Sequence, residues 1–192
     1  MSYQQLINKI NTHVRLTLED KNAVKEVFQS CEISKNTIAQ REFTIPKNLY
    51  FIQSGYMRLY YLNENGEEVT TRISKPTDFI TPFLQFIHQR PSKYITASIT
   101  DCQVLAVSGD NLRKLIGRSE RFQEFSILIF EEAIEFIEKR ADNLATLDAE
   151  QRYKLFIKNH TDILQNVPLK YIASYLGIKP ESLSRIRKKL IT

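Results

Sequence analysis

The C-terminal stretch VPLKYIASYLGIKPESLSRIRKKL (residues 167–190) carries the most specific pattern in the chain. It predicts two short helices, 169–176 and 180–190, that cross at a steep angle over a short turn. Such a crossing needs a small residue where the helices touch, which Ala173 supplies, and a turn residue that tolerates a positive φ, which Gly177 supplies. The inward stripe of the second helix is Leu183, Ile186 and Leu190. This register is typical of a helix-turn-helix.

The outward face of the second helix is polar and cationic. Arg185 can bond guanine in a bidentate manner, Glu181 can accept from cytosine, and Ser184 can pair with several bases. We therefore expect these three residues to read bases if the helix enters a major groove of double-stranded DNA. The expected DNA phosphate contacts are Lys170, Lys179, Ser182, Lys188 and Lys189. The alternative is an ordinary helical hairpin with a solvated face.

The charge of the chain is unevenly distributed. Among its 192 residues, 27 Lys or Arg and 22 acids give a net charge of +5. Residues 151–192 hold nine of the basic residues and two of the acidic ones, a net charge of +7. The remaining residues, 1–150, hold 18 basic and 20 acidic residues, a net charge of −2. A basic module on a mildly acidic body indicates a polyanionic partner, although a solvated basic face would look the same.

A long helix is expected over residues 119–147, where neither Gly nor Pro occurs. Apolar side chains recur there at alternating spacings of three and four, which is typical of the seam of a helical dimer. The predicted seam is Ile127, Phe130, Ile134, Ile137, Ala141 and Leu144. The alternative is that this stripe packs on its own domain. A second stripe, at Phe122, Phe125 and Ile129, could pack on the body while the first meets a partner.

Short β-rich runs broken by turn signals fill residues 31–108. Asn63–Gly66 (NENG) predicts a hairpin loop and Ser54–Gly55 a second turn. Thr81–His88 interrupts the strands and predicts a short helix, because Pro82 suits a first helical turn. Helical patterns also cover 2–30, 108–117 and 148–160. The first of these includes a capping box at Thr17 and Asp20.

These patterns together predict an α+β protein. An N-terminal antiparallel β-roll (a jelly roll) with flanking helices would occupy residues 1–118, a long dimerisation helix 119–147, and a helix-turn-helix 148–192. The DNA-binding unit would thus lie at the C-terminal end.

Several functional classes find no support in the sequence. No apolar run approaches the length of a membrane span, and no secretory signal is visible. Cys31 and Cys102 are far apart, and with three scattered His they give no metal-site spacing, so no metal and no cofactor is expected. Two unclustered cysteines suit a reducing cytoplasm. No catalytic constellation is readable, so we expect a protein that is not an enzyme.

The order of these parts resembles the Crp/Fnr family of bacterial transcription regulators. The resemblance rests on IQSGYMRLYYLNENGEE (52–68), KPTDFI (75–80), AEQRYKLFIKNH (149–160) and the C-terminal motif, in which ESLSR (181–185) is similar to the recognition helix of the Fnr-like branch. It implies a winged helix-turn-helix over 148–192. It also implies a homodimer that regulates transcription from a pseudo-palindromic operator with TTGA-like half-sites, with RNA polymerase as a further partner if it activates. The alternative is a small-ligand-binding regulatory module that acts through a protein partner.

The resemblance fails where members of this family bind cyclic AMP. Their Gly-Glu-Leu segment and phosphate-binding Arg correspond here to FITPFL (79–84) and RPSKYIT (90–96), and Pro91 stands where the Arg is expected. We therefore expect an unknown small-molecule effector other than cyclic AMP, and two cysteines cannot hold the iron–sulfur cluster of Fnr. The candidate effector pocket is Tyr60, Phe79, Ile80, Phe83, Ser92, Lys93 and Tyr94. The alternative is that these aromatic residues simply fill the roll.

Overall fold

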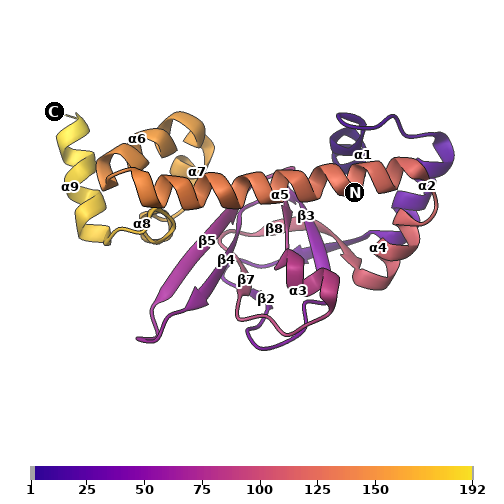
Figure 1. The fold of residues 1–192 in the computed structure, drawn as a ribbon, viewed down its shortest axis with the longest axis horizontal. Helices are drawn as coiled ribbons and strands as arrows, with labels where there is room; N and C mark the ends of the chain where they lie inside the picture. Colours follow the sequence, from indigo (N-terminus) through magenta and orange to yellow (C-terminus); the bar gives the residue numbers. More distant parts are fainter. Residues whose placement is uncertain (1–2, 192) are drawn as a thin grey trace.

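Two four-stranded antiparallel sheets form the β-roll in the computed structural model, which describes residues 3–191 (Figure 1). The first sheet, in spatial order, is β1 (Gln29–Ile33), β8 (Cys102–Ser108), β3 (Asn48–Ser54) and β6 (Phe79–Ile80). The second is β2 (Ile38–Gln40), β7 (Ile95–Ser98), β4 (Met57–Leu62) and β5 (Glu68–Ser74). The predicted antiparallel roll is thus confirmed. None of the helices in the described residues has the length and apolar character needed to cross a membrane.

The central strand β3 is apolar along most of its length because both of its faces are covered. Tyr50 and Ile52 point into the roll, where they pack with Val104, whereas Leu49 and Phe51 point to the opposite side and pack against helices. This explains why β3 lacks the apolar–polar alternation of a half-exposed strand.

The two predicted turns are present in the roll. Asn63 closes the β4–β5 hairpin, because its Oδ1 accepts the N–H of Asn65 at 3.0 Å and of Glu67 at 2.9 Å, while Gly66 has φ +77°. Gly55, between β3 and β4, has φ +86°. Both glycines occupy a backbone region that costs other residues free energy.

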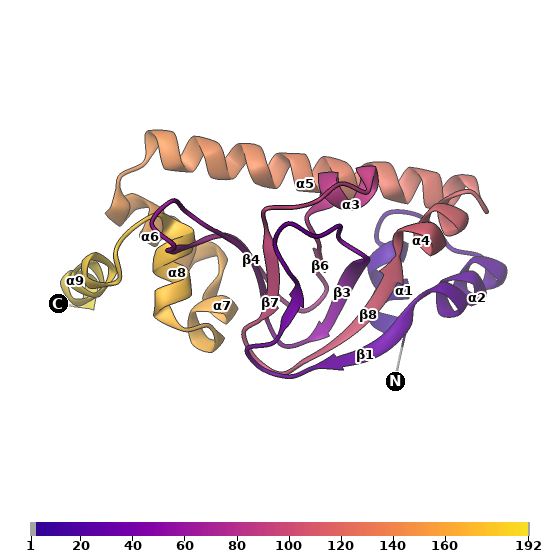
Figure 2. The same ribbon diagram turned by 90° about the horizontal axis from the view of Figure 1, so that it is seen from below.

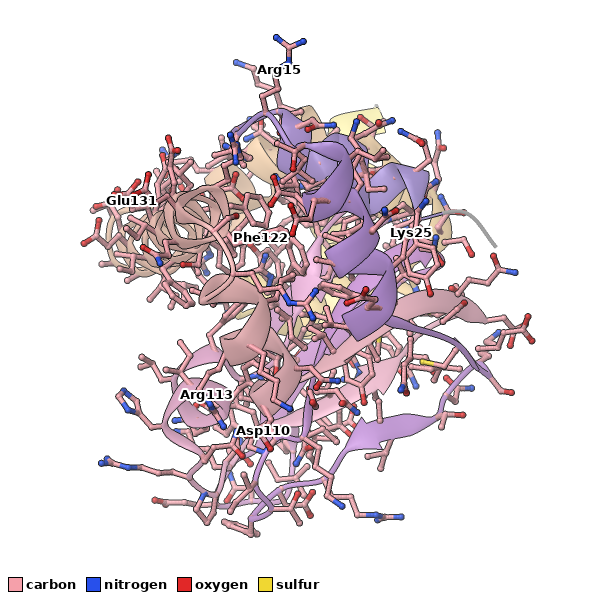
Figure 3. All side chains as sticks on the ribbon, turned by 90° about the vertical axis from the view of Figure 1, so that its right-hand side faces the viewer. Arg15, Lys25, Asp110, Arg113, Phe122 and Glu131 are labelled. Carbon is pink, nitrogen blue, oxygen red and sulfur yellow. The ribbon has the colours of Figure 1, made fainter. Side chains whose placement is uncertain are left out.

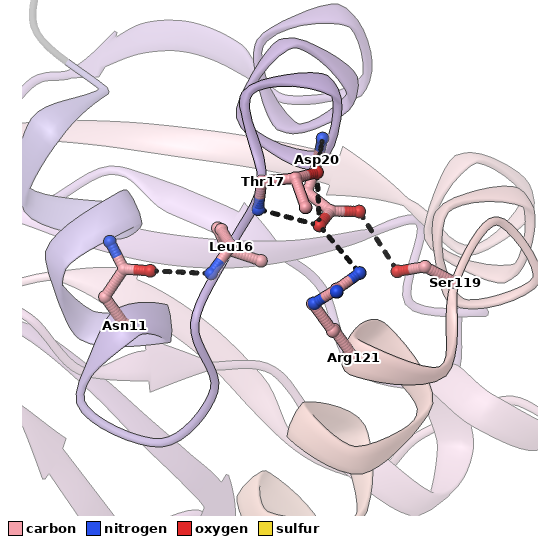
Figure 4. A network of polar contacts seen from close by, with 6 residues as sticks. All are labelled: Asn11, Leu16, Thr17, Asp20, Ser119 and Arg121. Carbon is pink, nitrogen blue, oxygen red and sulfur yellow. Dashed lines mark hydrogen bonds and ion pairs between the residues drawn. The ribbon is translucent and has the colours of Figure 1, made fainter.

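The N-terminal region predicted as helical over 2–30 forms two helices, α1 (Gln4–Asn11) and α2 (Leu18–Val27), which a loop separates, and β1 already begins at Gln29. The predicted capping box starts α2: the Thr17 hydroxyl accepts the Asp20 N–H at 3.1 Å, and the Asp20 carboxylate accepts the Thr17 N–H at 3.0 Å. Asp20 also accepts from the Ser119 hydroxyl at 3.1 Å and pairs with Arg121 at 3.6 Å (Figure 4). Burial raises the pKa of Asp20, but these partners outweigh it and hold the pKa below its ordinary value.

A helix of 27 residues, α5 (Glu120–Thr146), runs from the N-terminal helices to the C-terminal module, a length of about 40 Å (Figure 1). The second predicted stripe, Phe122, Phe125 and Ile129, is buried against the roll. Figure 3 shows Phe122 between α5 and the N-terminal helices, and Glu131 on the outer side of α5. Two shorter helices, α3 (Phe83–His88) and α4 (Gly109–Ile116), confirm the helices predicted near these positions.

The C-terminal module is a bundle of four helices at the other end of α5 from α1 and α2 (Figure 1). They are α6 (Ala149–Asn159), α7 (Thr161–Asn166), α8 (Leu169–Leu176) and α9 (Pro180–Ile191). The short α7 was not predicted. The described residues of the module contain no strand, so the expected wing is absent from this part of the chain. The reason is that the apolar side chains recur at helical spacing, without the alternation that a wing hairpin needs.

Candidate nucleic-acid interface and effector cavity

Helices α8 and α9 pack on each other through fully buried side chains. Ile172 and Ala173 of α8 are 0% exposed and Leu183 of α9 is 1% exposed. Gly177 ends α8 with φ +67°, and two backbone bonds close the turn, from the Ile178 N–H to the Ala173 carbonyl oxygen at 3.0 Å and from the Gly177 N–H to the Ser174 carbonyl oxygen at 3.2 Å. This pair of bonds is the Schellman motif. The small residue and the turn glycine therefore occupy the positions that the sequence pattern predicts.

The outward face of α9 is exposed. Glu181, Ser184 and Arg185 lie on it, and the Arg185 guanidinium donates to the Ser182 hydroxyl at 3.4 Å. Figure 2 shows α9 at the end of the molecule, beyond α8 and away from the roll. The three residues expected to read bases thus share one accessible helix face.

The cations expected at phosphates differ in their surroundings. Lys189 Nζ pairs with the Glu150 carboxylate at 2.8 Å, and Lys154 pairs with the same carboxylate at 2.7 Å. Hydrogen bonds from Lys154 and Lys189 lower the pKa of Glu150 to about 2. Lys170 lies over the Tyr171 ring at 4.9 Å. Lys179 and Lys188 are exposed.

The module joint, which we define as the contacts of α8 with β5 and α5, uses main-chain atoms of β5. Ser174 Oγ accepts the Thr70 N–H and donates to the Glu68 carbonyl oxygen, both at 2.8 Å. Arg140 of α5 donates from Nη1 to the Tyr175 carbonyl oxygen at 2.6 Å and from Nη2 to the Thr70 carbonyl oxygen at 3.1 Å. Three elements that are distant in the sequence meet here.

Arg58 reinforces the contact between the roll and α8. Its guanidinium carbon lies 3.9 Å from the centroids of both the Tyr60 ring of β4 and the Tyr171 ring of α8. The side chain is almost fully buried, and its charge is balanced by Glu68, at 2.6 Å. Cation–π contacts are strongest when desolvated, so this stack ties the module firmly to the hairpin. No sequence signal pointed to Arg58, because its partner Tyr171 is more than a hundred residues away.

A cavity of about 390 Å³ lies between the roll, α3 and α5. Leu59, Thr71 and Arg72 contribute from the hairpin strands, Phe83 and Leu84 from α3, Tyr94 from the loop before β7, and Phe136, Ile137, Arg140 and Leu144 from α5. Burial lowers the pKa of Arg72 and of Arg140, because a charged guanidinium loses hydration there. Neither arginine is among the residues that the sequence predicts for an effector pocket.

The seven residues predicted to line an effector pocket do not all meet. Phe83 and Tyr94 line this cavity. Phe79 packs on Phe51 and Phe125, with ring centroids 5.2 and 6.2 Å apart, and belongs to the core. The other positions serve elsewhere: Tyr60 packs with Ile95, Ile80 with Ile52, Lys93 lies over Tyr61, and the Ser92 hydroxyl accepts the Tyr94 N–H.

Most of the predicted dimer seam is exposed in the single chain. Ile137 is 62% exposed, and Ile127, Ile134, Ala141 and Leu144 are also exposed. Phe130 is half-buried against Phe83, with ring centroids 6.5 Å apart. One face of α5 thus packs on the roll while an apolar stripe beside it faces outward.

Both cysteines are free. Among the described residues, no group of three or more His, Cys, Asp or Glu side chains comes together in a way that could hold a metal ion.

Comparison with known proteins identifies the class of the roll. Residues 31–119 match the family model of the cyclic nucleotide-binding domain. A comparison with curated protein sequences finds no match.

Solved structures extend the likeness along the chain. FixK2 from Bradyrhizobium japonicum superposes with a TM-score of 0.75 at 18% identity, covering 85% of this chain and 84% of that chain. The c-di-GMP responsive global regulator CLP from Xanthomonas campestris superposes with a TM-score of 0.69 at 18% identity, covering 91% of each chain. A protein from Eubacterium rectale described as a regulator of the Crp/Fnr family gives 0.68 at 16% identity, covering 91% and 83%.

Residues 31–119 therefore resemble a cyclic nucleotide-binding domain, and the chain shares its fold with Crp/Fnr regulators, as the sequence resemblance predicted. At these identities, the likeness to the solved structures concerns the fold.

Proposed function

We propose that the chain is a sequence-specific DNA-binding transcription regulator that acts as a homodimer. The observation that carries the proposal is the accessible face of α9, where Glu181, Ser184 and Arg185 lie together on a helix whose opposite side is anchored by buried Leu183. Such a face can enter a major groove and bond to base edges. Lys170, Lys179, Ser182, Lys188 and Lys189 would contact phosphates.

The homodimer would form through α5. The exposed apolar stripe of this helix is long enough to pair with a second copy, which would place two α9 helices in successive major grooves about 34 Å apart. A pseudo-palindromic operator with TTGA-like half-sites would match this symmetry. The functional division would be 1–118 for sensing, 119–147 for dimerisation and 148–192 for DNA binding, in a regulatory protein of the cytoplasm rather than an enzyme.

The effector of the proposed regulator would bind in the cavity between the roll and α5. Cyclic AMP is a poor candidate, because Pro91 occupies the position of its expected phosphate-binding Arg and Ser92 is buried in the turn. An effector regulates only if it binds two poses of the DNA-binding module unequally.

Selection of bound sequences from a random DNA pool, followed by fluorescence anisotropy on the selected site, tests the DNA-binding proposal. Arg185→Ala should weaken the selected site by about 1–3 kcal/mol and relax preference at one base pair. Lys179→Ala should weaken binding to all DNA sequences alike and reduce the slope of log affinity against log salt concentration by about 1. Lys139→Ala, an exposed change on α5, is the control. Retention of full affinity and preference by both module variants would contradict the proposal.

A further inference from the structure

The cavity and the module joint share one side chain, Arg140. This residue lines the cavity and at the same time donates to the carbonyl oxygens of Thr70 and Tyr175. One turn earlier on the same helix, the Phe136 ring lies 4.7 Å below the Arg72 guanidinium, which also lines the cavity. Anything that draws Arg140 toward the cavity therefore acts on the contacts of α8.

The two guanidiniums in the cavity lack ion-pair partners. In the part of the chain that the structure describes, neither Arg72 nor Arg140 has a carboxylate oxygen within 4.0 Å of a guanidinium nitrogen. Asp78 and Glu132 act on Arg72 over a longer distance, so Arg140 is the less compensated of the two cations. Arg72 donates from Nε to the Ser74 hydroxyl at 3.1 Å. Arg140 donates to two neutral carbonyl oxygens, and its guanidinium carbon lies 4.5 Å from the centroid of the Tyr175 ring. The other walls are largely apolar, with side chains such as Leu59, Phe136 and Ile137. Partly desolvated cations beside an apolar space favour a ligand that brings a negative charge.

We infer that the cavity binds an organic anion with an apolar body, and that its anionic head withdraws Arg140 from the module joint. An anionic head carries a full negative charge and can accept two guanidinium N–H groups side by side, whereas each carbonyl oxygen is neutral and accepts one, so the ligand can compete for this guanidinium. Loss of the bonds to Thr70 and Tyr175 would loosen α8 from β5 and allow the module to change pose. The inference rests on the proposed function only in taking this cavity as the effector site.

Isothermal titration of the full-length protein, without DNA, tests the ligand class. The probes are octanoate, octyl phosphate and octanol, which share one apolar chain and differ in the head. Both anions should bind at least about tenfold more tightly than octanol, because only they form charge-assisted bonds. The two anions separate a carboxylate from a phosphate preference. Equal affinity for octanol would overturn the inference.

Two variants separate the binding of octanoate from the opening of the module joint. Arg72→Met should weaken octanoate about tenfold and leave the ligand-free module joint intact, because Arg72 makes no bond to α8. Arg140→Met should weaken octanoate and also open the joint without ligand. Lys139→Met, which alters an exposed cation on α5, should do neither.

Amide hydrogen exchange of β5 and α8 reports the release. Octanoate should accelerate exchange there in the unaltered chain, whereas Arg140→Met should exchange fast with or without octanoate. Binding of octanoate with no change in exchange would refute the coupling. Because these measurements contain no DNA, a failure of the DNA-binding tests leaves them interpretable, and the reverse is also true.

Discussion

Gly55 and Gly66 form a matched pair that tests the packing of the roll. Both have positive φ, +86° and +77°. A Cβ added at Gly66 would meet nothing within 4 Å, whereas a Cβ at Gly55 would collide with the Asp101 carbonyl oxygen and lie 2.7 Å from Cys102 Sγ. The two Gly→Ala changes thus share a backbone cost and differ in steric cost.

The expected loss of stability follows from these two terms. An L residue in the left-handed region costs about 1–2 kcal/mol, which is the whole effect expected for Gly66→Ala. Overpacking adds about 1–3 kcal/mol, so Gly55→Ala should cost about 2–5 kcal/mol. The collision at Gly55 is with backbone, which cannot rotate away as a flexible side chain can.

Urea unfolding of both variants, followed by circular dichroism, measures the difference. The midpoint should fall further for Gly55→Ala than for Gly66→Ala, with unchanged slopes if unfolding remains two-state. Equal midpoints would refute the reasoning, because they would mean that the β3–β4 turn does not lie against residues 100–102.

Three further changes test other parts of the structure. Asp20 has a lowered pKa in the folded chain, so its stabilisation is present above the unfolded value of about 3.8 and is lost as the pH falls through the lower folded value. Asp20→Asn should therefore flatten the dependence of stability on pH below about pH 4, measured by unfolding at several pH values, and an unchanged pH profile would count against the network. Ser174→Ala leaves the buried Thr70 N–H without its acceptor, so it should lower the free energy of unfolding by about 1–3 kcal/mol and speed hydrogen exchange of that amide. An unchanged exchange rate would show that the joint does not persist in solution. Ile137 is 62% exposed in the single chain and would be buried in a dimer through α5. Ile137→Glu should therefore weaken dimerisation by about 2–4 kcal/mol, measured by sedimentation velocity, whereas Glu138→Gln should not. An unchanged association constant would exclude the α5 seam.

The predictions that succeeded concern local patterns. The capping box at Thr17, the hairpin loop at Asn63–Gly66 and the long helix each depend on residues within a few positions of one another. Turn chemistry and side-chain periodicity suffice for such elements. The end of α1 was not predicted, because no Gly or Pro separates the two apolar stripes in residues 2–30.

The parts that could not be predicted depend on long-range contact. The Arg58 stack joins β4 to α8, and Arg140 joins α5 to both β5 and α8. Nothing near these arginines in the sequence marks them, since an exposed and a buried Arg look alike until the partner surface is known. The candidate effector residues lie in different parts of the structure for the same reason. The sequence shows that aromatic side chains are present, but it does not show which face of the roll each one occupies.

The hydrogen bonds of the module joint depend on the length of the β4–β5 hairpin more than on its side chains. Ser174 and Arg140 bond to the backbone of β5, at the Glu68 carbonyl and at both polar groups of Thr70, so these bonds do not depend on which side chains occupy the two positions. The Glu68 side chain has a separate role, because it pairs with the buried Arg58. A single insertion or deletion in the β4–β5 loop would disrupt these bonds, because a shift of β5 by one residue exchanges the two faces of the strand. Related chains should therefore keep the length of this hairpin more strictly than the side chains at positions 68 and 70.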